Sequence, residues 1–308
     1  MANQPIFITG EQRTGSSWIA QILATAAKTA WLDEPFNRKK PSVWLCEGRF
    51  SNWYTHIGRH NEAIFRQPIA DTLAFRFNWL AHWRRATSLA HWRRAWQVGQ
   101  QFRGYRQGGF RPLIKQPTGL FMAEWLANNF QAQVVVIVRH PAGYVSSRKR
   151  LGWRHNFNDF LDQPALMAGL LAPFAADIAH FAAREEAVVA QLALLWKIIF
   201  ATADHYRQTQ PKWLFLRYED VAADPETQFR QLFAQLGLTF TVQTGQLIRQ
   251  SSQAANPEEV AVQDWKSVQR NSQAAATTWK TRLNSQEIDQ IRAVVGEVGQ
   301  IFYKDDEW

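Results

Sequence analysis

The sequence contains a single cysteine, Cys46, in 308 residues. An internal disulfide framework and a cysteine-rich zinc site are therefore excluded, and a reducing compartment, the cytoplasm, is the expected location. No charged stretch followed by a long apolar run precedes Ile6, which predicts no signal peptide. No uninterrupted apolar segment approaches the roughly 20 residues of a membrane-spanning helix, so we expect no membrane span.

Acidic residues are in the minority, with 26 Asp and Glu against 35 Lys and Arg, for a net charge of +9. A basic chain favours an anionic partner, but a nucleic acid, a membrane surface, another polyanion and a phosphorylated cofactor all fit this charge. Aromatic residues are plentiful, and most of the 15 tryptophans are expected to serve packing. A hydrophobic content of 46% indicates a folded core rather than a disordered chain.

The order of predicted elements indicates an α/β fold. Residues 5–9 form a short apolar run that ends at Gly10, and residues 16–28 carry apolar side chains at helical spacing. The run Val134–Val138 has no polar alternation, as is typical of a central parallel strand covered on both faces. Further strands are expected at 113–115 and 213–217, and helices at 119–130, 142–150, 184–206, 225–236 and 285–302. We predict a P-loop-like three-layer fold with a mostly parallel sheet, in one domain spanning residues 1–308.

Residues 38–110 fit this scheme poorly because they are rich in Trp, Arg and His. The pentapeptide His82–Ala86 recurs at His91–Ala95. The nine-residue offset corresponds to about two and a half helical turns, so the two copies would not lie on one face of a single helix. We interpret the segment as an inserted helical, Trp/Arg-rich lid that borders an acceptor site. The alternative is a solvated basic helix whose arginine stems cover apolar surface.

The segment Gly10–Ser17 has the spacing of a P-loop, but Ser16 occupies the position of the lysine. Gly15 allows the backbone to approach a phosphate, and the N–H groups at the start of the following helix bind anions. The strongest strand ends in Val138 and Arg139 rather than in an aspartate, so a Walker-B acid is also missing. Kinases and NTPases need magnesium held by such groups. We therefore predict a phosphate ligand without a triphosphate, with Arg13 supplying the positive charge.

A second anion site is predicted directly after the central strand. Arg139 lies where open α/β sheets bind ligands, and Ser147 follows eight residues later. We expect the two side chains to hold a second phosphate from one side, away from the first loop. A single nucleotide that carries phosphates at both ends accounts for both sites.

Five elements, in order along the chain, resemble motifs of the sulfotransferase family that uses 3′-phosphoadenosine 5′-phosphosulfate (PAPS), with most likeness to its carbohydrate-type and bacterial branch. They are Arg13–Trp18, Lys115–Pro117, Arg139–Ser147, the pair Arg217–Asp220 and Asp224–Pro225, and Trp279–Leu283 with Glu287. The chain departs from the family at His140, where Asp or Asn is usual, and it lacks the R-K-G triplet that precedes the last tryptophan in the cytosolic branch.

The resemblance implies roles for particular residues. It assigns the 5′ side of PAPS to Arg13, Thr14, Gly15, Ser16 and Ser17, adenine stacking to Trp18, the 3′-phosphate to Arg139 and Ser147, and a place near the base to Tyr218. Arg270 or Lys280 would replace the missing triplet. Trp18 and Tyr218 would otherwise be read as packing residues. No metal is expected, and the product would be phosphoadenosine phosphate (PAP).

Sulfuryl transfer needs cations at the leaving oxygen and a base at the acceptor hydroxyl. Arg13 and the loop amides suit the first task. Glu34 is the preferred base, because the resemblance implies an E-P element after the first helix, although a solvated loop glutamate is the alternative. The other candidate bases are His56, His60, His140 and His155.

The expected activity is transfer of a sulfuryl group from PAPS to a hydroxyl, of a saccharide or another small hydroxylated molecule, without specific nucleic-acid binding. Two alternatives remain at this point. One is a P-loop kinase of small molecules, and the other is a non-catalytic basic protein that binds a polyanion through its charge and its Trp/Arg segment.

Overall fold

The computed structural model describes residues 4–39, 44–253, 255–257 and 271–308. In this part of the chain, five parallel strands form one sheet in the order β2-β3-β1-β4-β5. The strands are β1 (Ile6–Thr9), β2 (Thr29–Asp33), β3 (Arg111–Lys115), β4 (Gln133–Val138) and β5 (Leu214–Arg217). The predicted α/β class with a parallel central sheet is confirmed.

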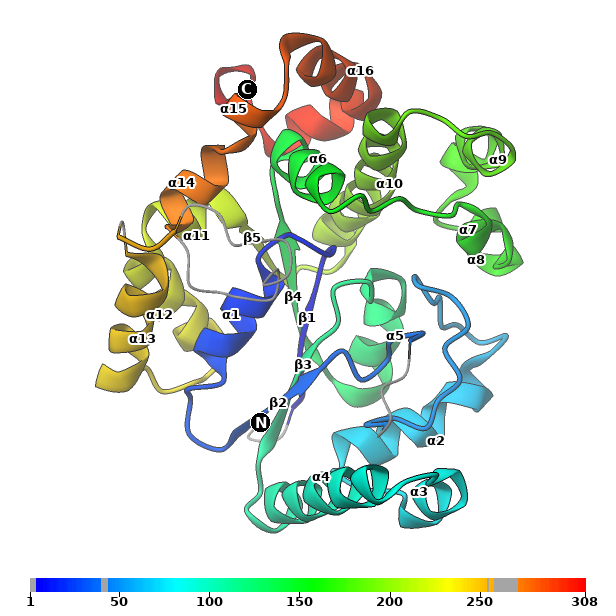
Figure 1. Ribbon diagram of the computed structural model, residues 1–308, viewed down its shortest axis with the longest axis vertical. Helices are drawn as coiled ribbons and strands as arrows, with labels where there is room; N and C mark the ends of the chain where they lie inside the picture. The colour runs from blue at the N-terminus through cyan, green and yellow to red at the C-terminus, as the bar shows by residue number, and fades with distance from the viewer. Residues whose placement is uncertain (1–3, 40–43, 254, 258–270) are drawn as a thin grey trace.

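Helices cover both faces of the sheet (Figure 1). One face carries α1 (Ser16–Leu23), α11 (Tyr218–Ala223), α12 (Pro225–Gln235) and α13 (Val242–Ser252). The other carries α2 (Glu62–Leu73), α4 (Leu89–Gln107), α5 (Leu120–Phe130), α6 (Pro141–Arg150), α10 (Val188–Thr209) and α16 (Ser285–Phe302). The remaining helices are α3 (Trp79–Arg85), α7 (Asn158–Leu161), α8 (Pro164–Ala168), α9 (Ala175–Ala183), α14 (Ser272–Thr277) and α15 (Trp279–Arg282), with 3₁₀ turns at Ala172–Phe174 and Asp305–Glu307.

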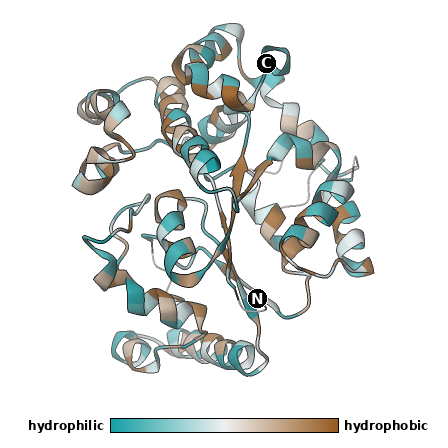
Figure 2. Ribbon diagram, turned by 180° about the vertical axis from the view of Figure 1, so that it is seen from behind, coloured by the Kyte–Doolittle hydropathy of each residue, from teal (hydrophilic) through white to brown (hydrophobic). Residues whose placement is uncertain are grey.

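The two covered faces explain the apolar strands. Successive side chains of β4 point to opposite faces, so Val135 joins the core under α1 while Val134 and Val136 join the core under α5 and α10. Neither set reaches water, and the strand therefore reads as an uninterrupted apolar run. Figure 2 shows the same concentration of hydrophobic residues along the central strands.

The connections after β1 and β4 create a crevice at the carboxyl edge of the sheet. The two strands are neighbours, but β1 leads into α1 on one face and β4 leads into α6 on the other. Ligands of open α/β sheets bind where adjacent connections diverge in this way. The phosphate loop and Arg139 both lie at this point.

The helix predictions agree with the structure where local capping signals are strong. Asn284 and Glu287 form a capping box at the start of α16, and Asp224 caps α12 ahead of Pro225. The predicted helix 184–206 instead begins at Val188 as α10.

Helix α10 is long and apolar enough to span a membrane, but 78% of its most apolar 18-residue segment is buried in the protein. We therefore describe it as the core helix of the fold.

The repeated pentapeptide lies on two facing helices, α3 and α4. The ring centroids of His82 and His91 are 5.7 Å apart, and those of Trp83 and Trp92 are 5.2 Å apart. Trp79 likewise contacts Trp96, so the two helices run antiparallel. The two copies therefore lie on separate helices, so the question of one face of a single helix does not arise for them.

Candidate functional site

A cavity of about 1000 Å³ opens at the carboxyl ends of the strands. Its walls come from the loop after β1, from the ends of β2, β3 and β4, and from segments 38–39, 53–54 and 152–156. Among the described residues, α2, α3 and α4 contribute nothing to the wall. The part of segment 38–110 that borders the cavity is therefore limited to residues 38–54, which we call its first stretch. That this stretch closes over the cavity as a lid stays a prediction.

The phosphate loop depends on two glycines with positive φ. Gly10 has a φ of +139°, and a Cβ atom at this position would lie 2.3 Å from the Ile137 carbonyl oxygen. Gly15 has a φ of +93°, and a Cβ atom would lie 2.5 Å from Cδ2 of Tyr218. The Thr14 hydroxyl donates to the Glu11 carbonyl oxygen at 2.7 Å and closes the loop internally. Only glycine allows the backbone to pass β4 and the Tyr218 ring this closely.

The two predicted anion sites touch each other. Arg13, at a φ of +70°, donates from Nε to the Ser147 hydroxyl at 3.0 Å. Arg139 donates from Nη1 to the carbonyl oxygen of Arg13 at 2.7 Å and from Nη2 to that of Ala275 at 3.0 Å. The expectation that Arg139 and Ser147 lie away from the first loop is therefore wrong. The reason is the strand order, because β1 and β4 are neighbours and their loops emerge side by side.

Trp18 and Tyr218 have both a packing role and a place in the cavity wall. The Trp18 indole N–H donates to the Ser251 hydroxyl at 2.8 Å, and its ring meets Tyr218 and Phe229 edge-on. The Tyr218 ring lies under Gly15 and 4.8 Å from the Arg139 guanidinium. Both side chains line the cavity although they are almost fully buried. Adenine stacking by Trp18 stays a prediction.

The remaining residues of the predicted nucleotide site differ in position. Ser16 and Ser17 line the cavity at the start of α1. Lys280 does not belong to the described wall: its ammonium group lies 5.1 Å from the Trp279 ring and donates to the Trp308 carbonyl oxygen at 3.4 Å. Arg270 lies outside the described residues.

A group that we call the carboxylate cluster, Asp33, Glu34, Asn37 and Lys115, forms another part of the wall. The buried ammonium group of Lys115 contacts both Asp33 and Glu34 at 2.7 Å, and Asn37 donates to the other Glu34 oxygen at 2.7 Å. Parallel β2 and β3 end together, which brings Asp33 opposite Lys115. The cluster holds the Glu34 carboxylate in a defined place, and each oxygen keeps a lone pair for another hydrogen bond.

A buried ion pair beneath the cavity was missed by the sequence analysis. Arg148 donates to the Glu11 carboxylate at 2.7 Å and to the Tyr144 hydroxyl at 3.1 Å. Burial raises the pKa of Glu11, although the Arg148 guanidinium opposes the shift. Burial and the Glu11 charge raise the pKa of Tyr54 well above its usual range. The only signal in the sequence was that Glu11 lies within the phosphate loop and Arg148 directly follows Ser147 of the second predicted anion motif.

The histidines that were candidate bases differ in their distance from the cavity and in their pKa. His155 lines the cavity, where burial and Arg148 lower its pKa to about 3. His140 caps α6 and stacks on Trp279 instead, and burial lowers its pKa to about 3 as well. His56 and His60 stack on each other outside the described wall, and burial lowers the pKa of His56 to about 4. A base with a pKa near 3 is a weak proton acceptor at neutral pH.

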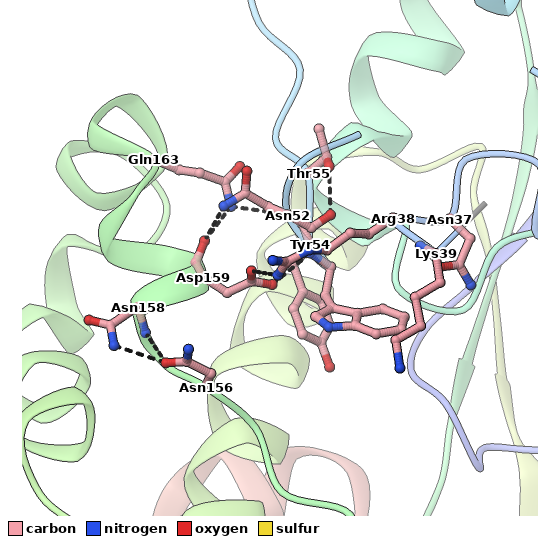
Figure 3. A network of polar contacts seen from close by, with 11 residues as sticks. Asn37, Arg38, Lys39, Asn52, Tyr54, Thr55, Asn156, Asn158, Asp159 and Gln163 are labelled. Carbon is pink, nitrogen blue, oxygen red and sulfur yellow. Dashed lines mark hydrogen bonds and ion pairs between the residues drawn. The ribbon is translucent and has the colours of Figure 1, made fainter. Parts of the chain in front are cut away.

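Asp159, at the start of α7, ties the first stretch of segment 38–110 to the protein (Figure 3). Its carboxylate accepts from the Trp53 amide at 2.6 Å and from Arg38 at 3.1 Å. Lys39 lies over the Trp53 ring at 5.6 Å. Burial raises the pKa of the Asp159 carboxyl. These contacts place one tryptophan and two cations on the cavity wall.

Comparison with known proteins shows which family this chain matches. Residues 5–242 match the model of the sulfotransferase family. Among solved structures, the sulfotransferase domain from the curacin biosynthetic pathway is 16% identical, with a TM-score of 0.47 over 94% of this chain and 96% of that domain. The sulfotransferase domain of the Synechococcus PCC 7002 olefin synthase is also 16% identical, with a TM-score of 0.46 over 96% and 95%. A search of curated protein sequences gives no match.

Proposed function

This chain belongs to the sulfotransferase family, and from that premise we propose that it transfers a sulfuryl group from PAPS to the hydroxyl group of an acceptor. The observation that carries the proposal is the meeting of the phosphate loop and the second anion motif around Arg13 and Ser147. A nucleotide with phosphates at both its 5′ and 3′ positions would use both parts.

The residues present fit such a nucleotide. The first residues of α1, Ser16 and Ser17, line the cavity, and the N-terminus of a helix is a favourable place for a phosphate or sulfate. Nε of Arg139 is buried and has no hydrogen-bond partner in the described part of the chain. A buried donor of this kind is costly unless a ligand or water satisfies it. This unpaired donor supports a 3′-phosphate next to Arg139.

In the proposed reaction, Arg13 and the loop amides stabilise the negative charge that develops on the bridging oxygen of the departing PAP. Glu34 accepts the proton of the acceptor hydroxyl while that oxygen forms its bond to sulfur and the bond from sulfur to the phosphate oxygen breaks. Lys115 and Asn37 hold the carboxylate for this task. Glu34 is preferred over His155 because the depressed pKa of the histidine makes it a poor base.

The cavity wall supports a saccharide or another small hydroxylated acceptor. Rings of Trp31, Trp53 and Trp153 line it together with the amides of Asn37 and Asn156. Aromatic faces cover the apolar faces of sugars, while amide groups bond their hydroxyls. The cations Arg38, Lys39 and Arg154 on the same wall would accommodate an acidic group on the acceptor.

Two further features bear on the proposal. The P-loop lysine is replaced by a nearly buried Ser16, and this favours PAPS over a nucleoside triphosphate as the ligand. The chain has one cysteine, the buried Cys46, so it cannot form an internal disulfide, which supports our proposal of a cytoplasmic location.

Calorimetric titration of the purified protein with PAP tests the donor site, and titration with ATP and magnesium is the control. We expect PAP to bind and ATP to bind more weakly. Transfer of label from sulfur-labelled PAPS to a panel of saccharides and phenols then tests the reaction. Absence of PAP binding, or tighter binding of ATP, would overturn the proposal.

A further inference from the structure

The antiparallel helices α3 and α4, which we call the hairpin, form a second surface whose composition is unusual. Between residues 74 and 110 the chain has seven arginines, four tryptophans and no acidic residue. Most of the +9 charge of the protein is therefore concentrated in this short segment. Figure 1 shows the two helices lying side by side at one end of the molecule, and none of their described residues lines the cavity.

The inner side of the hairpin is anchored to the protein. Arg85 forms two hydrogen bonds of 2.7 Å with the Glu47 carboxylate, and the His82 ring lies 3.2 Å from the Trp44 carbonyl oxygen. His91 and Phe102 are buried on the same side of α4. The orientation of the hairpin is thus set by contacts with the rest of the fold, and its opposite side is left in solvent.

The outer side exposes large apolar side chains. The exposed fractions are 71% for Trp83, 61% for Trp96, 60% for Leu80 and 78% for Leu89. Trp79, Trp83, Trp92 and Trp96 line a groove of about 600 Å³ between the two helices. Clustered apolar side chains of this size on a surface mark an interaction site.

Arginines share this outer side. At 100° per residue, Leu89, Arg93 and Trp96 fall within a narrow arc of α4, opposite the buried residues. Trp83 and Arg84 are likewise exposed on α3. Arg84, Arg93, Arg94, Arg103 and Arg106 are exposed and form no ion pair with the described part of the chain. The usual separation of apolar and charged sides is therefore absent, since tryptophan and arginine alternate toward solvent.

A close contact fixes one of the four tryptophans, Trp79, against the other helix of the hairpin. Gly99 faces Trp79, and a Cβ atom at position 99 would lie 2.1 Å from that ring. The Trp79 ring therefore packs directly on the backbone of α4, beside Trp96. Asn78 and Ser88 cap the two helices and stabilise their starts. The surface is thus a defined arrangement of rings rather than a loose loop.

We propose that the outer side of the α3–α4 hairpin is a docking surface for a membrane with anionic phospholipids. Unpaired arginines complement the negative charge of the headgroups, while exposed tryptophans and leucines enter the interface between headgroups and acyl chains. A nucleic acid or an acidic polysaccharide would account for the arginines, but it would leave Leu80 and Leu89 without a role. The combination of both side-chain types favours the membrane.

The experiment is co-sedimentation of the full chain with vesicles of equimolar phosphatidylcholine and phosphatidylserine, with pure phosphatidylcholine vesicles as reference. Two double variants probe the two contributions: R84E/R93E for charge and W83A/W96A for insertion. The matched controls are K212E/R184E, which changes the charge equally outside the hairpin, and V242A, which removes an exposed apolar side chain elsewhere. Circular dichroism and PAP binding verify that each variant is folded.

We expect the wild type to bind the anionic vesicles in a salt-dependent manner, and each double variant to lose about tenfold in affinity or more while the controls retain it. Three outcomes would overturn the proposal: no preference for anionic vesicles, equal loss in the controls, or unchanged vesicle binding by W83A/W96A. The last outcome, together with retained heparin binding, would identify a general polyanion site instead.

Discussion

The phosphate loop and the carboxylate cluster line the same cavity, but they are built in different ways. The loop is one continuous segment, Gly10–Ser17, whose proposed binding groups are mostly backbone amides, and its path depends on two glycines. The carboxylate cluster is made of side chains from two strand ends, with Lys115 lying more than 80 residues after Asp33. We therefore expect the loop to tolerate replacement of its side chains but not of its glycines. The carboxylate cluster should instead be affected by the loss of any one of its charged or amide groups.

The largest effect is expected at Glu34. In Glu34→Gln the side chain keeps its size and can still bond to Lys115, but it no longer accepts a proton, so transfer should fall by roughly 10²–10⁴-fold. PAP binding measured by calorimetry should remain. Asp33→Asn is the matched control, because Asp33 contacts the same ammonium group. Equal losses in the two variants would mean that the charge of the cluster matters rather than a base at Glu34, and undiminished transfer would leave His155 as the candidate.

Arg139 provides the next test, on the anion side of the cavity. Arg139→Ala removes charge-assisted hydrogen bonds that are worth roughly 1.5–3 kcal/mol, so PAP affinity should fall about 10- to 100-fold. Lys280→Ala should leave the affinity unchanged, since Lys280 contacts Trp279 and Trp308 and not the described cavity wall. A comparable loss in the Lys280 variant would show that this lysine reaches the nucleotide after all.

Gly15→Ala tests whether the loop depends on its backbone. A methyl group at Gly15 would meet the Tyr218 ring, and the positive φ adds strain, so unfolding free energy should fall by about 2 kcal/mol and PAP binding should weaken. Gly109→Ala is a control with a positive φ but open space around the new atom. Thermal unfolding compares the two variants, and an equal loss would remove any special role for the contact with Tyr218.

The smallest predicted effect concerns pH and the two buried histidines. Folding depresses the pKa of His140 and His155 to about 3, so below the ordinary value of 6.5 the unfolded chain binds more protons than the folded one. Stability should therefore fall as pH decreases, by about 1 kcal/mol for each histidine between roughly pH 6.5 and 5.5. Urea unfolding of His155→Phe and His140→Phe should show a weaker pH dependence, and an unchanged slope would contradict the depressed pKa values.

The sequence predicted the site unevenly. Arg13, Ser17, Glu34 and Arg139 were predicted and all line the cavity, because each follows a strand of a parallel sheet and such strand ends share one edge. The Glu11–Arg148 pair was not predicted, since it joins residues that are 137 positions apart through the packing of α6 beneath the loop. The expectation that Ser147 lies away from the loop that contains Arg13 was wrong for a similar reason. The sequence does not show that β4 is the neighbour of β1 in the sheet.

Local patterns in this sequence and their order along the chain determined the α/β class, the phosphate loop, the capped helices and the resemblance to sulfotransferases, since each is read from short segments of the chain. Tertiary structure decided which loops adjoin, that Lys115 holds Glu34, and that the two copies of the repeated pentapeptide face each other on antiparallel helices. These contacts depend on strand order and helix packing, which arise from burial of apolar surface over the whole chain and leave no short motif.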